Sequence, residues 1–261
     1  MNALDFGLGA VEQDFWRVVF LMTRVGAAML AAPFFGATSI PVTARLCLTG
    51  ALAIFVAAWM PMLTPPAALF SAEGLLMVAG EVLVGLCLGF VLQIAFAAPV
   101  IAAEVISGSM GMSMTMTADP TTGGQMTAFG QFFTLVLIVI FLALGAHLHF
   151  ISLVVESYRS FPPGETWLGP GRFEMIASFG SDMFTTALRM AIPVTLVLLL
   201  VQIVTGVLSR SAPSLNLFAL GLPAGVLAGL VALIIAAPLI YDQLSGIVEV
   251  SLDQAEGVIT R

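Results

Sequence analysis

Apolar residues run through this chain in long blocks, each followed by a shorter polar or Pro/Gly-rich stretch. A membrane-spanning helix needs about 20 predominantly apolar residues, and the blocks have that length. The pattern therefore predicts an all-α integral membrane protein of about six apolar helices arranged as hairpins. The expected helices cover residues 15–35, 45–61, 73–107, 126–157, 175–209 and 215–250.

Two of these helices are too long for an ordinary span. Residues 73–107 and 126–157 would each reach about 50 Å at 1.5 Å per residue, whereas the hydrocarbon core is roughly 30 Å thick. They could tilt, bend at Pro99, or pack in an assembly that is not embedded lengthwise in lipid.

Between these two helices lies the sequence GSMGMSMTMTADPTTGG, residues 108–124. Its methionines alternate with Gly, Ser and Thr, a period of two that favours an extended segment over a helix. Lipid cannot satisfy the polar groups of extended backbone, so this Met-rich segment should face protein or a pore. Methionine side chains can seal an irregular gap and then repack. A mobile surface loop that happens to be rich in methionine is an equally acceptable reading.

Residues 160–172, SFPPGETWLGPGR, form a long polar, Pro/Gly-rich stretch that divides the chain. The first part, residues 1–174, carries the Met-rich segment at the tip of its long hairpin. The second part, residues 175–261, is predicted to be a helical hairpin with a polar tail. Pro193 is expected to kink the first arm of that hairpin.

Charged residues inside the apolar blocks need partners, because an unpaired charge near the bilayer centre costs at least a few kcal/mol. Arg17 and Arg24 are seven residues apart and fall on nearly the same side of a helix. Arg17 is expected to mark the membrane interface. Arg24, Glu81 and Glu104 are expected to be paired within the chain or between subunits.

Two stripes of small or polar residues recur at every fourth position, a spacing that favours close contact between helices. The first stripe consists of Glu81, Gly85, Gly89 and Gln93. The second consists of Gly221, Gly225 and Gly229, and it could serve either packing within the chain or a subunit interface. Gln202 adds a polar group near the turn of the second hairpin.

The amino-acid composition agrees with a membrane protein and argues against nucleic acid as a partner. Of 261 residues, 60% are hydrophobic and 9% are charged, against about 25% charged in soluble domains. A net charge of −7 makes nucleic acid an unsuitable partner. Arginines are too few and too scattered to set the membrane orientation. Cys47 and Cys87 lie inside apolar runs, where a packing role is expected.

The sequence contains no motif that indicates a catalytic site. His147 and His149 are two residues apart, which places them on opposite sides of a helix and not around a metal ion. Tyr241-Asp242 is similar to one motif of intramembrane aspartyl proteases, but their second motif is absent from the sequence. Walker-type loops, nucleophile elbows and CxxC pairs are absent as well. We therefore expect no enzymatic activity, no cofactor and no metal.

Taken in order along the chain, the residues resemble the FliR family, export-gate subunits of the flagellar type III secretion system. In the first part the resemblance rests on Arg24, Pro33-Phe34-Phe35-Gly36, Ile40-Pro41, Arg45, Glu81, Gly85, Gly89, Gly108, Gly111 and Asp119-Pro120. In the second it rests on Pro193, Gln202, Gly206, Arg210, Pro213, Asn216, Phe218, Gly221 and Pro223.

The resemblance implies a function and partners. Subunits of this family join FliP and FliQ around a protein-conducting path, FlhB packs on the cytoplasmic side, and unfolded flagellar proteins are exported. The location implied is the bacterial inner membrane, in the flagellar basal body. The first part is similar to FliP and the second to FliQ. The Met-rich segment corresponds to a plug of the closed gate, formed by Gly108, Met110, Gly111, Met112, Met114, Met116, Asp119 and Pro120. This chain carries methionine there where members often carry aromatic residues.

Two alternatives remain open at this point. The equivalent subunit of a virulence-type injectisome would have a similar sequence. A small multipass transporter would instead use Arg24, Glu81 or Glu104 to bind a solute near the membrane midplane.

Overall fold

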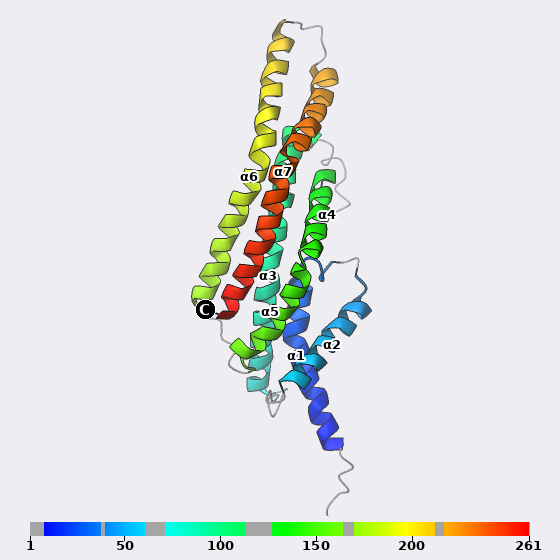
Figure 1. The fold of residues 1–261 in the computed structure, drawn as a ribbon, viewed down its shortest axis with the longest axis vertical. Helices are drawn as coiled ribbons and strands as arrows, with labels where there is room; N and C mark the ends of the chain where they lie inside the picture. Colours follow the sequence, from blue (N-terminus) through cyan, green and yellow to red (C-terminus); the bar gives the residue numbers. More distant parts are fainter. Residues whose placement is uncertain are drawn as a thin grey trace, which may run out of the picture. The chain divides into compact units, whose positions relative to one another are not determined.

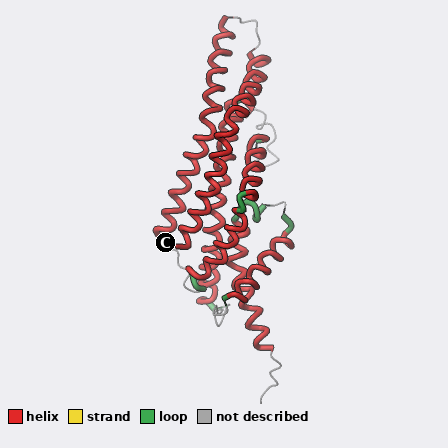
Figure 2. Tube along the Cα trace, viewed as in Figure 1, coloured by secondary structure: helices red, strands yellow, loops and turns green. Residues whose placement is uncertain are grey.

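The computed structural model describes residues 8–37, 40–60, 71–112, 127–163, 170–211 and 217–260 (Figure 1). Throughout these ranges the regular structure is helical and no strand occurs (Figure 2). The expected all-α class is therefore confirmed. The helices in the described ranges are α1 (Leu8–Ala31), α2 (Val42–Trp59), α3 (Ala72–Ser109), α4 (Ala128–Ala143), α5 (Ala146–Ser160), α6 (Pro170–Ser211) and α7 (Leu217–Thr260).

The first helix begins and ends earlier than the expected 15–35. After α1 the chain turns through residues 33–36, and the Gly36 N–H donates to the Ala32 carbonyl at 2.7 Å. A Cβ on Gly36 would collide with the carbonyl oxygen of Leu30, so the turn requires glycine. The apolar pattern continues through Phe34 and Phe35 because these side chains pack onto the protein from a turn and not from a helix.

The single helix expected over 126–157 is wrong, because the chain forms two helices there. Gly145 adopts a left-handed conformation, with φ of 68°, between α4 and α5. Glycine reaches this region without steric cost, whereas other residues do not. At the other end of α4, the Thr127 side chain accepts a hydrogen bond from the Gly130 N–H at 3.1 Å and caps the helix.

The remaining long helices agree with the expected ones. α3 and α6 extend beyond them at both ends, whereas α7 begins at Leu217 and extends past residue 250 to Thr260. α3, α6 and α7 contain 38, 42 and 44 residues, and at 1.5 Å per residue each exceeds about 55 Å. Each also contains proline: Pro99 in α3, Pro193 in α6, and Pro223 and Pro238 in α7. The helices continue past these prolines, and the kink at Pro193 stays a prediction.

Four helices in the described ranges are long and apolar enough to cross a membrane: Val42–Trp59, Ala72–Ser109, Gly171–Ser211 and Gly221–Thr260. The pair α4 and α5 would make a fifth if the two helices act as one broken span. Length and composition therefore agree with the expected integral membrane protein.

The chain divides into two compact units. Unit 1 comprises Met1–Gln93, Gly145–Phe179 and Ser251–Arg261, and unit 2 comprises Ile94–Leu144 and Gly180–Val250. Contacts within the fold, and not the order of the sequence, set this division, so α3, α6 and α7 each belong to both units. The expected parts 1–174 and 175–261 describe a different property, their likeness to two other subunits, which stays a prediction.

Each unit has its own packed interior. In unit 1, α1 packs against α2 and α5, and the ring of Phe35 stacks on Phe150 at a centroid distance of 6.2 Å. In unit 2, Phe96 of α3 meets Phe141 of α4 edge-to-face at 5.6 Å. The Glu104 side chain of α3 also accepts a hydrogen bond from the Thr127 N–H, at 3.2 Å, just before α4 begins.

Candidate functional site

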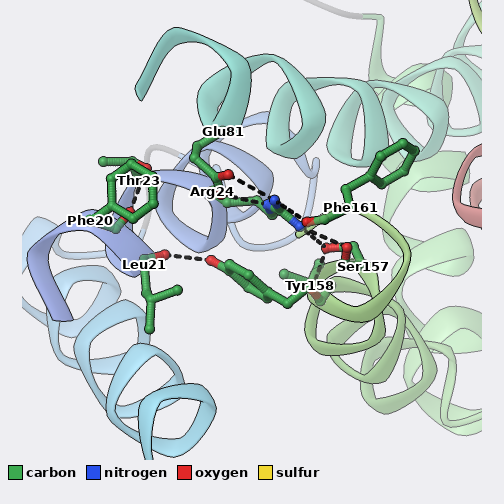
Figure 3. Close-up of polar contacts among 9 residues, drawn as sticks. Phe20, Leu21, Thr23, Arg24, Glu81, Ser157, Tyr158 and Phe161 are labelled. Atoms are coloured by element: carbon green, nitrogen blue, oxygen red, sulfur yellow. Dashed lines mark hydrogen bonds and ion pairs between the residues drawn. The ribbon is translucent and has the colours of Figure 1, made fainter. Parts of the chain in front are cut away.

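Arg24 of α1 and Glu81 of α3 form a buried ion pair within unit 1 (Figure 3). The Arg24 Nε lies 2.7 Å from Glu81 Oε2, and Nη2 lies 2.9 Å from Oε1, so the contact is bidentate. Both side chains are 0% exposed. The expected pairing of these two charges is therefore confirmed, and it is made inside one chain.

The end of α5 supplies the remaining partners of the Arg24 guanidinium (Figure 3). Nη1 donates to the Ser157 carbonyl at 2.7 Å and to its hydroxyl at 3.2 Å, and Nη2 donates to the Phe161 carbonyl at 2.8 Å. The Ser157 carbonyl also accepts the Phe161 N–H at 2.9 Å, and the carbonyls at the end of a helix carry partial negative charge. A cation with several donors therefore stabilises this helix end.

Tyr158 contacts both the Arg24 guanidinium and the backbone of α1. Its ring centroid lies 4.1 Å from Arg24 Cζ, a cation–π geometry, and its hydroxyl donates to the Leu21 carbonyl at 2.6 Å. The guanidinium thus joins α1, α3 and α5. Removing one partner of such a pair leaves an uncompensated buried charge, which typically costs about 3–5 kcal/mol.

Gly85 and Gly89 allow α3 to approach α1 closely enough for this pair to form. A Cβ on Gly85 would collide with the Arg24 carbonyl oxygen, and a Cβ on Gly89 would lie 2.6 Å from the Ala28 carbonyl oxygen. The first three members of the expected stripe therefore form a helix contact within the chain. Gln93, its fourth member, is exposed and lies outside that contact.

Other arginines also bind backbone carbonyls where helices end. Arg17 donates through Nη2 to the carbonyls of Ala57 and Met60, at 2.8 and 2.6 Å, at the end of α2. It therefore caps a helix, a role not foreseen in the expectation that it marks the membrane interface. Arg45 donates to the carbonyls of Phe35 and Ala37, at 3.1 and 3.0 Å, in the turn after α1.

The Met-rich segment is described at its first residues. Gly108 lies inside α3, which continues to Ser109, so the extended conformation expected from residue 108 is wrong at this end. Helix hydrogen bonding carries on to Met110, whose N–H donates to the Ile106 carbonyl at 3.0 Å. Gly111 then takes a φ of 81°, which ends the helix in a left-handed turn before Met112. Met114, Met116, Asp119 and Pro120 lie outside the described residues.

Met110 packs against the second glycine stripe, on α7 of unit 2. Its side chain is 2% exposed and occupies the space where a Cβ on Gly229 would stand. A Cβ on Gly225 would lie 3.3 Å from the Met110 carbonyl oxygen. Gly221 is half-buried. Gln202 of α6, which is exposed, donates to the Ser109 carbonyl at 2.8 Å.

Three further polar residues singled out in the sequence are Glu104, His147 and His149. Glu104 is exposed and accepts a hydrogen bond from the Thr127 N–H, and among the described residues no arginine forms an ion pair with it. His147 is half-buried and His149 is exposed. Within the ranges that the structure describes, no group of three or more His, Cys, Asp or Glu side chains could hold a metal ion.

Sequence patterns missed some of these residues. Ser157, Tyr158 and Phe161 lie more than 130 positions from their α1 partners and carry no motif. Gly145 was detectable, because a glycine within an apolar run often marks a break.

Comparison with known proteins relates most of the chain to one family. Residues 15–250 match the family described as "Bacterial export proteins, family 1". The flagellar biosynthetic protein FliR of Pectobacterium carotovorum subsp. carotovorum is 32% identical over 230 residues, which cover 88% of this chain and 86% of that protein. FliR of Escherichia coli (strain K12) is 30% identical over 226 residues, covering 87% and 84%. FliR of Aquifex aeolicus (strain VF5) is 33% identical over 225 residues, covering 85% of each.

Proposed function

This chain belongs to the bacterial export proteins, family 1, and on that premise we propose that it is a membrane-embedded export-gate subunit of a flagellar type III protein secretion apparatus. The observation that carries the proposal is the match over residues 15–250, together with flagellar relatives at 30% identity or more over most of both chains. The site of action is the bacterial inner membrane, within the flagellar basal body.

The partners proposed are FliP-, FliQ- and FlhB-type subunits, with unfolded flagellar proteins as the exported substrates. Large apolar side chains along α6 support an assembly: Phe173 is 48% exposed and Leu208 is 53% exposed, with many others between them. These two positions are 35 residues apart, about 50 Å along a helix, which exceeds the roughly 30 Å of the hydrocarbon core. Partner proteins would cover the exposed apolar side chains of α6 that lie beyond the hydrocarbon core.

The Met-rich segment is the proposed gate within that assembly. At the start of this segment, Met110 packs against Gly225 and Gly229 of α7. Gly111 follows it in a left-handed conformation. Soft methionine side chains suit a seal that must yield to a passing substrate and then close again.

A small-solute transporter fits the described residues poorly. Arg24 and Glu81 satisfy each other, and carbonyls of α5 take up further donors of Arg24. Glu104 accepts a backbone hydrogen bond. The charges of Arg24 and Glu81 that a solute would need are therefore already used in holding the fold.

The proposal is tested by deleting the gene from its host and restoring it with an affinity-tagged copy. We expect the deletion strain to secrete no flagellar proteins and to be non-motile, and the tagged copy to restore both. The tagged chain should co-purify with FliP- and FliQ-type subunits in mild detergent. Normal flagella in the deletion strain, or solute uptake by vesicles that contain this chain alone, would overturn the proposal. Loss of an injectisome with motility intact would identify the virulence-type equivalent.

A further inference from the structure

Among the candidate spans in the described ranges, α2 is the one whose length matches a bilayer. Its 18 residues reach about 27 Å, and the hydrocarbon core is roughly 30 Å thick. α3, α6 and α7 are each more than twice as long. A bilayer can therefore cover α2 from end to end and leave none of its apolar length in water.

The outer side of α2 is apolar and is not covered by the rest of unit 1. Three of the 18 residues are buried. Residues 46–58 carry no charged side chain. The large apolar side chains that are more than half exposed are Val42, Leu46, Ile54, Phe55 and Trp59. This side of α2 needs an apolar environment from outside the chain.

That apolar environment has a sharp limit at the end of α2. The Arg159 guanidinium lies over the ring of Trp59, with its Cζ 4.7 Å from the ring centroid. Arg159 also pairs with Glu156 at 3.2 Å, and the two side chains are 51% and 48% exposed. Exposed charges are costly in hydrocarbon, whereas the amphipathic ring of tryptophan favours the level of the lipid headgroups. The apolar environment therefore ends between Phe55 and Trp59.

Arginine side chains lie at both ends of this helix. Arg17 donates to two carbonyls at the end of α2, and Arg45, in its first turn, donates to two carbonyls of the turn that precedes it. Arginines near the ends of a span extend their guanidinium groups toward the membrane surface. The helix thus has an uncharged middle between two ends that suit the two membrane surfaces.

We propose that the outer side of α2 is a lipid-facing surface, with Trp59 and Arg159 at the headgroups of one leaflet and Arg45 near those of the other. The inference rests on the membrane location in the proposed function, and it adds which helix contacts the phospholipids there. A partner protein could cover an apolar helix of any length. Lipid explains both the length of α2 and the residues at its ends.

Three exposed alanines give a ruler along this surface. Ala44, Ala51 and Ala58 are seven residues apart, so they share one side of α2 and are separated by about 10 Å steps along its axis. Each is changed to cysteine and labelled with a nitroxide in the complete complex, reconstituted in phospholipid vesicles, with all other cysteines replaced. Ala53→Cys is the control, because Ala53 is 0% exposed.

Two relaxation agents distinguish lipid, water and protein around each label. Oxygen concentrates in hydrocarbon, a nickel chelate stays in water, and a label covered by protein meets neither. We expect the ratio of oxygen to nickel access to be highest at Ala51→Cys and several-fold lower at Ala44→Cys and Ala58→Cys. Ala53→Cys should show low access to both agents.

Low access to both agents at Ala51→Cys would mean that a partner subunit covers α2, and high nickel access there would mean water. Either result overturns the inference. Should a labelled variant fail to assemble, the unmodified complex is crosslinked to a phospholipid with a photoreactive group in its acyl chain. Adducts within residues 46–58 are expected, and their absence contradicts the inference. Failure of the proposed function is separable, because it would appear as normal secretion in the strain that lacks the gene.

Discussion

At the residue scale, the use of arginine explains much of how this chain holds together. Its basic residues are all arginine and none is lysine. Arg17, Arg24, Arg45 and Arg172 each donate to backbone carbonyls, and Arg172 reaches Val258 near the end of α7 at 2.9 Å. A planar guanidinium carries five donors, whereas an ammonium is a compact point charge with three. Arginine therefore suits the carbonyl clusters that helix ends leave unpaired.

Glu81→Gln should destabilise the protein strongly, because Arg24 would remain buried without its counter-charge. The expected loss is about 3–5 kcal/mol of unfolding free energy. It should appear as a lower thermal unfolding midpoint and a lower yield of the complex in detergent. Glu104→Gln serves as the control, because Glu104 is exposed. Equal midpoints for the two variants would mean that the ion pair contributes little to stability.

At the element scale, glycine decides which helices can touch and where they break. On α3, Gly85 and Gly89 allow close contact with the backbone of α1. On α7, Gly225 and Gly229 contact Met110, near the start of the Met-rich segment. Gly145 has a different role, since its φ of 68° ends one helix and begins the next. Spacing in the sequence could identify the stripes, because period four is a local property of a helix.

Gly85→Ala should force α1 away from α3, since the added Cβ meets the Arg24 carbonyl oxygen and backbone cannot rotate aside. Overpacking of this kind typically costs about 1–3 kcal/mol. Gly108→Ala is the control in the same helix, because its Cβ would meet nothing within 4 Å. There alanine should be neutral or stabilising by up to about 1 kcal/mol, given its higher helix propensity. Thermal midpoints of the purified complexes compare the two, and a smaller loss for Gly85→Ala than for Gly108→Ala would refute the contact.

At the scale of the whole molecule, α6 exposes large apolar side chains from Phe173 to Leu208, over about 50 Å of helix, whereas the hydrocarbon core is roughly 30 Å thick. The chain also places its strongest polar interactions inside, in the Arg24 cluster. The exposed apolar surface fits the proposed assembly with partner subunits. The gating role proposed for the Met-rich segment belongs to that assembly, because one chain need not form a pore.

Deletion of residues 110–116, with the flanking helices α3 and α4 kept, should let the complex assemble but leak small solutes across the cell membrane. Replacing Met110, Met112, Met114 and Met116 together with alanine should leak less, because the backbone still obstructs the path. Burial of each apolar side chain in a seal is worth about 1.5–3 kcal/mol, so losing several weakens closure without abolishing it. Membrane conductance in cells that make every partner is the measurement. If an assembled deletion variant shows the conductance of the wild type, the Met-rich segment is an ordinary loop and not a gate.

The sequence by itself determined the class of fold, the approximate helices and both glycine stripes, because apolar blocks and residue spacing are local properties of a helix. It also indicated that Arg24 and Glu81 must be paired, because burying an isolated charge is too costly. It missed the end of α1 and the break at Gly145, because a turn can bury apolar residues as well as a helix does.

The tertiary structure alone decided which partners those residues take. Arg24 bonds to Ser157 across 133 positions, and Met110 occupies the space left by Gly229 more than a hundred residues later. Periodicity cannot report such contacts, since it describes the face of one helix and not its neighbour. It likewise cannot show that the Met-rich segment and the second glycine stripe meet, which depends on how α3, α6 and α7 pack in three dimensions.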